Sequence, residues 1–315
     1  MQTIRTAVIG VGYLGRFHAQ KYKTLPQSQL MGVVDIHPDR ARQVGEELGV
    51  ESYTGLADIL PQVDAVSIAA TTSLHYALGM ECLKAGKHVL MEKPMASTSG
   101  EAAELAFLAE ANSLVLQVGF LERFNPAFQA SLPFISNPQF IETIRISPFK
   151  ERGHDVDVVL DLMIHDLDLI FSLVTSPLKG LHAVGTHLMT EQTDLANVRL
   201  MFENGAVADI TSSRISNKAE RKFRVFQSNR YVSMDLSAPS ARVYSADRTP
   251  GPTGGPTVTE ESLPLEKGDA LLAEITSFLA AIQNKTPPVV SGRDGVHTME
   301  VAERIIADIA HNRLP

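Results

Sequence analysis

The sequence lacks the features of two large classes of protein, disulfide-rich secreted domains and membrane-spanning chains. Its one cysteine, Cys82, excludes an intramolecular disulfide and is typical of a reducing compartment. No apolar run approaches the roughly 18 residues that a membrane-spanning helix needs. The N-terminus has the pattern of a strand followed by glycines, which is not that of a signal peptide. We therefore expect a cytoplasmic protein with no membrane partner.

Positive charge is also scarce, because 28 Lys and Arg residues stand against 36 Asp and Glu residues. The formal net charge of −8 argues against a nucleic acid or an anionic membrane surface as the main partner. The length of 315 residues is enough for two domains, and an apolar content of 44% is ordinary for a globular protein.

The first 120 residues alternate short apolar strands with helical patterns. This alternation predicts an α/β fold with a doubly wound parallel sheet, a Rossmann domain over residues 1–120. The expected strands are 6–9, 30–34, 65–69, 89–91 and 114–118, and the expected helices are 13–25, 38–48, 74–85 and 100–112.

The pattern changes in residues 121–315, which we expect to form a substrate-binding and oligomerisation domain. A long helix followed by successive strands predicts an α+β domain with an open, mostly antiparallel sheet. The final helix could pack back on the first domain. The expected helices are 157–173, 270–283 and 295–311, and the expected strands are 181–185, 197–202, 206–212, 223–227 and 231–236.

A glycine motif, Gly10-Val-Gly12-Tyr13-Leu14-Gly15, joins the first expected strand to the first expected helix. Glycines there permit a tight turn, a close approach of a pyrophosphate and close helix packing. Asp35 lies 20 positions beyond Gly15, the spacing expected for an acid that binds the adenosine ribose. The motif therefore predicts a dinucleotide site, and Asp35 favours NAD over NADP, although Arg40 and Arg42 weaken that preference.

Small residues follow the third strand at the same carboxyl edge of the sheet. Ala70, Thr71 and Thr72 would pack beside the nicotinamide half of the cofactor. His75 falls on the first turn of the next helix and is a further candidate for cofactor contact, with a surface position as the alternative.

Glu92 and Lys93 come directly after the short apolar strand 89–91, and Pro94 prevents that strand from continuing. In a parallel sheet the carboxyl end of a strand is where ligands bind, so Lys93 can contact the substrate and the cofactor. Glu92 can position Lys93 or contact the nicotinamide ribose. The alternative is a solvated Glu-Lys pair.

A second constellation, Asp161, His165 and Asp168, falls on one face of the expected helix 157–173. A carboxylate beside an imidazole can orient the ring and raise its basicity, which suits a base that removes an alcohol proton. A helix-stabilising ion pair is the alternative. A metal site would have one histidine and no cysteine, and we expect none.

These motifs occur in the order seen in the Gfo/Idh/MocA oxidoreductases, which the chain resembles along essentially its whole length, including Gly292-Arg-Asp-Gly295. The resemblance implies a catalytic role for Lys93, Asp161 and His165. It also implies a second domain whose open sheet forms an oligomer interface, and we expect a homodimer or homotetramer.

One branch of that family, the UDP-N-acetylglucosamine 3-dehydrogenases, shares finer motifs with this chain. They include residues 122–126 and 146–149, and Val158-Val-Leu160 stands where many other members have a glycine-rich stretch. The resemblance implies oxidation of the 3-hydroxyl of a nucleotide sugar in lipid A or surface-polysaccharide precursor synthesis. Inositol or free-sugar oxidation, and non-catalytic NAD(H) sensing, are the alternatives.

Four further residues are candidates for binding the substrate. An arginine offers a bidentate fork to a diphosphate, although a surface charge is the alternative for each basic group. The candidates are Arg123, Asn125, Lys150 and Arg152. Whether His165 or Lys93 is the base stays open, because burial could lower the pKa of the lysine.

Overall fold

The computed structural model describes residues 3–149, 156–247 and 257–312. The chain forms two compact units, Met1–Leu121 with Asp269–Met299, and Glu122–Gly268 with Glu300–Pro315. The expected division at 120/121 differs from the observed one because residues 269–299 return to the first unit. No helix in the described ranges is both long and apolar enough to cross a membrane.

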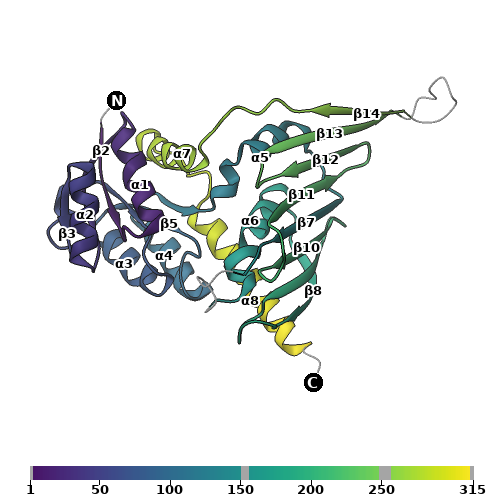
Figure 1. The fold of residues 1–315 in the computed structure, drawn as a ribbon, viewed down its shortest axis with the longest axis horizontal. Helices are drawn as coiled ribbons and strands as arrows, with labels where there is room; N and C mark the ends of the chain where they lie inside the picture. Colours follow the sequence, from purple (N-terminus) through teal and green to yellow (C-terminus); the bar gives the residue numbers. More distant parts are fainter. Residues whose placement is uncertain (1–2, 150–155, 248–256, 313–315) are drawn as a thin grey trace. The chain divides into compact units, whose positions relative to one another are not determined.

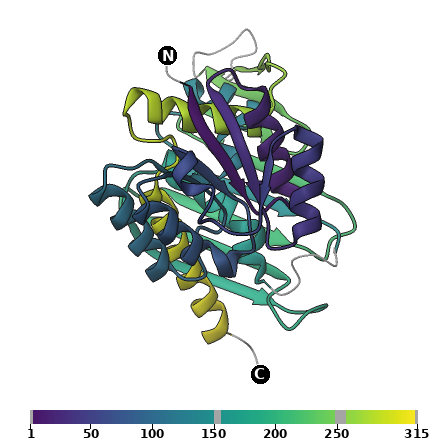
Figure 2. The same ribbon diagram turned by 90° about the vertical axis from the view of Figure 1, so that its left-hand side faces the viewer.

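The first unit contains a six-stranded sheet in the order β3-β2-β1-β4-β5-β6. Every pairing in this sheet is parallel, which confirms the predicted Rossmann fold. In Figure 2, which looks onto this unit, helices lie to either side of the purple strands. The strands are β1 (Ile4–Ile9), β2 (Ser28–Val34), β3 (Glu51–Tyr53), β4 (Ala65–Ile68), β5 (His88–Glu92) and β6 (Leu116–Gly119). The helices that alternate with them are α1 (Tyr13–Thr24), α2 (Pro38–Leu48), α3 (Thr72–Lys84) and α4 (Ser99–Ala111).

Helix α7 (Ala270–Asn284) explains why a late segment belongs to the first unit. Its Ile275, Phe278 and Leu279 are fully buried in one apolar cluster with residues of α1, α2 and the sheet. Burying a side chain of this size stabilises the fold by about 1.5–3 kcal/mol. In addition, Gln117 Nε2 of β6 donates a hydrogen bond of 3.0 Å to the carbonyl oxygen of Glu274.

The second unit contains an eight-stranded sheet in the order β14-β13-β12-β11-β7-β10-β9-β8. Only the β7–β10 pair is parallel among the pairs of these strands, so the prediction of a mostly antiparallel sheet is confirmed. The strands are β7 (Phe140–Ile146), β8 (Leu178–Thr186), β9 (Leu195–Phe202), β10 (Val207–Ser213), β11 (Glu220–Phe226), β12 (Arg230–Asp235), β13 (Ser240–Asp247) and β14 (Thr257–Ser262).

One face of this sheet packs against helices and the other carries aromatic side chains. Figure 1 shows α5 (Pro126–Ser131) and α6 (Ile164–Leu173) against the first face, and the end of α8 (Gly292–His311) joins the same core. On the other face Phe226 stacks on Tyr231 at 4.5 Å, and Tyr231 stacks on Tyr244 at 5.0 Å between ring centroids. Phe140 extends this aromatic row to β7, with 5.6 Å between its ring centroid and that of Phe226.

Three strands of this sheet, β7, β13 and β14, were not among the predicted strands. In β7 the buried face carries Ile141, Thr143 and Arg145, so the usual apolar alternation is absent from that face. All of β14 is exposed and gives no buried pattern to find. Periodicity predicts a strand only where one face is apolar.

Candidate active site

The glycine turn between β1 and α1 has the geometry that a bound dinucleotide requires. Gly10 has a φ of +82°, and a Cβ there would lie 2.7 Å from the backbone of Ala70. A Cβ on Gly15 would lie 1.8 Å from the Gly10 carbonyl oxygen. A Cβ on Gly12, in contrast, would meet no atom within 4 Å. Gly10 and Gly15 therefore make the turn itself, and Gly12 leaves open space at the start of α1, where a pyrophosphate fits.

Asp35 follows β2 and is held against this turn. Its Oδ2 accepts a hydrogen bond of 3.0 Å from the Val11 amide, and its Oδ1 accepts one of 2.9 Å from the His37 amide. The Nη1 of Arg40 lies 3.3 Å from Oδ2. The carboxylate is thus fixed at the carboxyl edge of the sheet, as the spacing predicts, with a cation beside it.

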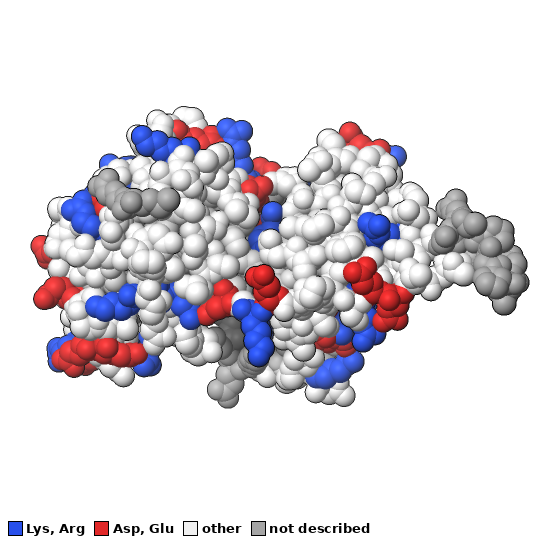
Figure 3. Space-filling model, turned by 90° about the horizontal axis from the view of Figure 1, so that it is seen from above, with Lys and Arg blue, Asp and Glu red and all other residues white. Residues whose placement is uncertain are grey.

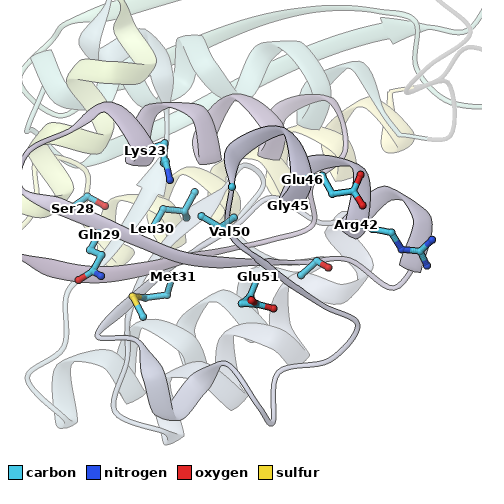
Figure 4. A pocket seen from close by; sticks show the side chains of 12 residues that line it. Lys23, Ser28, Gln29, Leu30, Met31, Arg42, Gly45, Glu46, Val50 and Glu51 are labelled. Carbon is cyan, nitrogen blue, oxygen red and sulfur yellow. The ribbon is translucent and has the colours of Figure 1, made fainter.

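A groove of about 550 Å³ lies between α1 and α2 beside this turn. Gly12, Tyr13, Phe17 and Arg40 are among its lining residues, and Tyr13 and Leu14 are well exposed. A larger cavity of about 780 Å³ lies elsewhere, around the amino ends of β2 and β3 (Figure 4). Ligands of parallel α/β sheets bind at the carboxyl ends of the strands, so the groove, which includes Gly12 and Arg40, adjoins the expected cofactor site, and the larger cavity does not.

The loop after β4 is tied to the loop after β5 by His75. Its Nδ1 lies 2.8 Å from the Pro94 carbonyl oxygen and its Nε2 lies 3.1 Å from the Ala70 carbonyl oxygen. Burial lowers the pKa of His75, although these two carbonyl oxygens and the charge of Glu92 oppose the shift. His75 is therefore a buried residue that holds two loops together. Thr71 precedes α3, and Thr72 is its first residue.

Glu92 is the last residue of β5, and Lys93 follows it at the carboxyl edge. The Glu92 carboxylate is not a solvated surface group, because its Oε1 lies 3.0 Å from Nε2 of the buried His18. Its Oε2 accepts a hydrogen bond of 3.2 Å from the Lys93 amide. Burial by itself raises the pKa of Glu92, but His18 and Lys93 together outweigh it and hold that pKa below its usual value.

The predicted long helix of the second unit begins with an irregular segment. Residues Val159–Met163 form a π-helix, which contains Asp161, and α6 then begins at Ile164 and contains His165. A π-turn adds one residue to a helical turn and is frequent at functional sites. Regular periodicity predicted α-helix over the whole of 157–173, so the start of that prediction is wrong. Both candidate catalytic residues nevertheless lie on one continuous helical segment, four positions apart.

The other predicted residues of the second unit have structural partners. Arg123 Nε donates a 2.7 Å bond to Asp168, and Nη2 donates a second of 3.0 Å. Asn125 caps α5 through its Oδ1, and its Nδ2 donates to Glu122 and to the Leu236 carbonyl. These contacts give no support to the predicted role of either residue in substrate binding. Lys150 and Arg152 lie outside the described residues.

Sequence reasoning missed a buried group of residues that is linked to Glu92 by hydrogen bonds. His18 and Tyr22 are buried one turn apart on α1, and Ser67 is buried in β4. A histidine and a tyrosine on the buried face of a helix were a signal that could have been used. Glu274, fully buried on α7, gave no local signal. Within the described residues, one group of potential metal ligands is found: His18, Glu92 and Glu274, whose ring nitrogen and carboxylate oxygens lie within 4.8 Å of one another.

Comparison with known proteins agrees with this geometry. A family model described as the NAD-binding Rossmann fold of the Gfo/Idh/MocA oxidoreductases matches residues 4–120. A model of the Gfo/Idh/MocA C-terminal domain matches residues 144–232. The chain is also 39% identical, over 96% of both chains, to UDP-N-acetylglucosamine 3-dehydrogenase of Acidithiobacillus ferrooxidans. The chain belongs to the Gfo/Idh/MocA oxidoreductase family.

Three further comparisons show how far the similarity extends. The solved structure of the Acidithiobacillus ferrooxidans enzyme superposes with a TM-score of 0.92 over 99% of each chain at 37% identity. Myo-inositol 2-dehydrogenase of Thermotoga maritima is 28% identical over 93% of this chain and 92% of its own. A levoglucosan dehydrogenase solved with NADH, 18% identical with a TM-score of 0.86 over 99% of this chain and 98% of its own, shares the fold. As a member of this family, the chain is an NAD-binding oxidoreductase.

Proposed function

We propose that this enzyme oxidises a secondary hydroxyl of a nucleotide sugar with NAD, and that the substrate is UDP-N-acetylglucosamine, oxidised at its 3-hydroxyl. The observation that carries the substrate is the 39% identity, over nearly the full length, to an enzyme of that name. The absence of a glycine-rich stretch at residues 158–160 favours the same branch. A role in lipid A or surface-polysaccharide precursor synthesis, in the cytoplasm, is part of this proposal.

The cofactor is assigned to the carboxyl edge of the first unit. The Gly10–Gly15 turn would hold the pyrophosphate, Asp35 the adenosine ribose, and Ala70, Thr71, Thr72 and Glu92 the nicotinamide half. The fit rests on the open space at Gly12 and on the position of the Asp35 carboxylate. NAD is favoured over NADP because Asp35 would repel a 2′-phosphate, although Arg40 offsets part of its charge.

The reaction needs a hydride acceptor, a base and a group that stabilises negative charge on oxygen. When bound, NAD⁺ accepts the hydride from the carbon that bears the hydroxyl. We assign His165, oriented by Asp161, to remove the hydroxyl proton. We assign Lys93 to donate a hydrogen bond to the same oxygen while its charge develops. The alternative within this proposal is that Lys93 takes the proton, which a lowered lysine pKa would allow.

An oligomer formed through the sheet of the second unit is also proposed. The aromatic row Phe140, Phe226, Tyr231 and Tyr244 lies on the face away from α5 and α6, and its members are only partly buried. Stacked aromatic rings that remain partly exposed are typical of the core of a protein interface.

The face of the molecule seen in Figure 3 mixes acidic and basic side chains, which offers no continuous basic surface to a nucleic acid.

The test is absorbance at 340 nm with NAD and a panel of UDP-sugars, free sugars and inositols. We expect turnover with UDP-N-acetylglucosamine and a 3-keto product by NMR. Turnover with myo-inositol alone would favour the branch of the Thermotoga maritima relative, and tight NADH binding with no turnover of any polyol would contradict an enzymatic role.

Two substitutions test the assigned catalytic groups. We expect Lys93→Ala and His165→Ala to abolish turnover while the affinity for NADH stays nearly unchanged, because both groups are assigned to the reacting oxygen. Wild-type rates in both variants would refute the assignment. A matched control is Lys23→Ala, since Lys23 lines the cavity at the amino ends of the strands and should be without effect.

A further inference from the structure

His18 has no role in the predicted site, yet its imidazole ring contacts the carboxylate of Glu92 at the carboxyl end of β5. It lies on α1, one turn beyond the glycine motif, and is 1% exposed. Its Nε2 lies 3.0 Å from Glu92 Oε1. An ionised carboxylate can only accept hydrogen bonds, so Nε2 must carry the proton that joins the two groups.

The imidazole ring is itself anchored on its other side. His18 Nδ1 lies 3.3 Å from Ser67 Oγ, which in turn lies 2.8 Å from the Tyr22 hydroxyl. All three residues are at most 1% exposed. Burial raises the pKa of Tyr22, and the charge of Glu274 adds to that effect, so the phenol keeps its proton. The ring therefore has a fixed position from which to hold Glu92.

Glu92, held in place by His18, in turn fixes the backbone of Lys93. Its second oxygen, Oε2, accepts the amide proton of Lys93, so one carboxylate joins His18 to the predicted catalytic lysine. Gly119 on the neighbouring strand leaves room for the Glu92 carboxylate, because a Cβ at position 119 would lie 3.2 Å from Glu92 Oε2. Both oxygens of Glu92 are thus used to fix the start of the Lys93 loop.

We propose that His18 is a positioning residue of the active site, which acts by donating its Nε2 proton to Glu92 and so fixes the backbone of Lys93. This inference rests on the proposed function for its kinetic test, and it is independent of which sugar is the substrate. The charged or titratable groups around the Glu92 carboxylate are His18 on α1, Lys93, His75 on α3 and Glu274 on α7.

A pair of similar substitutions separates this role from simple packing. In His18→Gln the side-chain amide can reach the position of Nε2 and still donate to Glu92. In His18→Asn the amide reaches only the position of Nδ1, on the side of Ser67. Asparagine is one methylene smaller than glutamine, so the melting temperatures of the two variants report the difference in packing, and the pH profile reports the contact with Glu92. Ser131→Ala serves as the control, because it removes a buried hydroxyl that donates to the Ala127 carbonyl and contacts no residue of this cluster.

The readouts are the pH profile of kcat/KM, kcat, and NADH affinity from pH 5 to 9. We expect His18→Asn to lower kcat about 10- to 100-fold, the effect of a small misplacement of a catalytic group. Loss of a donor to the ionised carboxylate should also move the acid limb of the profile to higher pH. His18→Gln should recover most of both effects, and Ser131→Ala should keep the wild-type limb with a lower melting temperature.

Equal impairment of the Asn and Gln variants with an unmoved acid limb would overturn the proposal, as would wild-type behaviour of His18→Asn. If the His18 variants do not fold, Glu92→Gln tests the same contact, and its acid limb should disappear. NADH affinity keeps the outcomes distinct. Without any turnover by the wild-type enzyme the proposed function fails. A shift to higher pH in the acid limb of NADH binding, seen in His18→Asn and absent from the wild type, would still support the role of His18.

Discussion

Gly12→Ala should separate the folding of the glycine turn from its function. Gly12 has a φ of −66°, which any L-amino acid adopts, and no atom lies within 4 Å of the position of an added Cβ. A glycine-to-alanine change at such a position stabilises the folded state by about 0.4–1 kcal/mol, because the unfolded chain loses freedom. We therefore expect the melting temperature of the free protein to stay constant or rise slightly.

Cofactor binding should respond in the opposite direction. The added methyl group would occupy space that the pyrophosphate needs, and would separate it from the amides at the start of α1. A lost hydrogen bond to a charged group costs about 1.5–3 kcal/mol, which is about 10- to 150-fold in Kd. At an NADH concentration of about 100 times the wild-type Kd, ligand stabilises the protein by about 2.7 kcal/mol. A Kd weakened about 100-fold would reduce that stabilisation to about 0.4 kcal/mol.

The assay is thermal unfolding with and without NADH, supported by fluorescence titration. Gly10→Ala is the control, because its φ of +82° and the contact of 2.7 Å with Ala70 make any side chain strained. That variant should lose stability without ligand, by at least about 1–2 kcal/mol. Unchanged NADH affinity in Gly12→Ala would refute the assignment of the pyrophosphate to this turn.

Three further predictions concern stability and assembly. Burial lowers the pKa values of His75 and His88 in the folded state, so their contribution to the free energy of unfolding should be fully present above pH 6.5 and be lost as the pH falls below it. His75→Gln should therefore flatten the pH dependence of the melting temperature. Arg145→Met should cost about 3–5 kcal/mol in urea unfolding, because the buried Asp166 loses the arginine that bonds both its oxygens and Glu122 loses one of its two arginines, whereas Arg199→Met in an exposed pair should cost less than about 1 kcal/mol. Tyr231→Asp should dissociate the proposed oligomer in light scattering, and an unchanged mass would count against that interface.

Much of the first unit could be predicted because its signals are local. Each βα pair lies within about 30 residues, and the glycine turn, Asp35 and Glu92 all fall at strand ends that apolar runs mark. The second unit was predicted less completely. Its strand β7 has Arg145 on the buried face, where it is stabilised by Glu122 and Asp166 from other segments. A buried charge with remote partners leaves no apolar period in the sequence.

The sequence by itself determined the Rossmann architecture, the cofactor turn and the position of Lys93 at a strand end, because these depend on backbone freedom and short-range periodicity. Tertiary structure alone decided that the segment with α7 returns to the first unit, that the helix with Asp161 begins with a π-turn, and that His18 contacts Glu92. Those features depend on packing between segments far apart in the chain. Glu274 and His18, 256 positions apart, share one buried cluster for that reason.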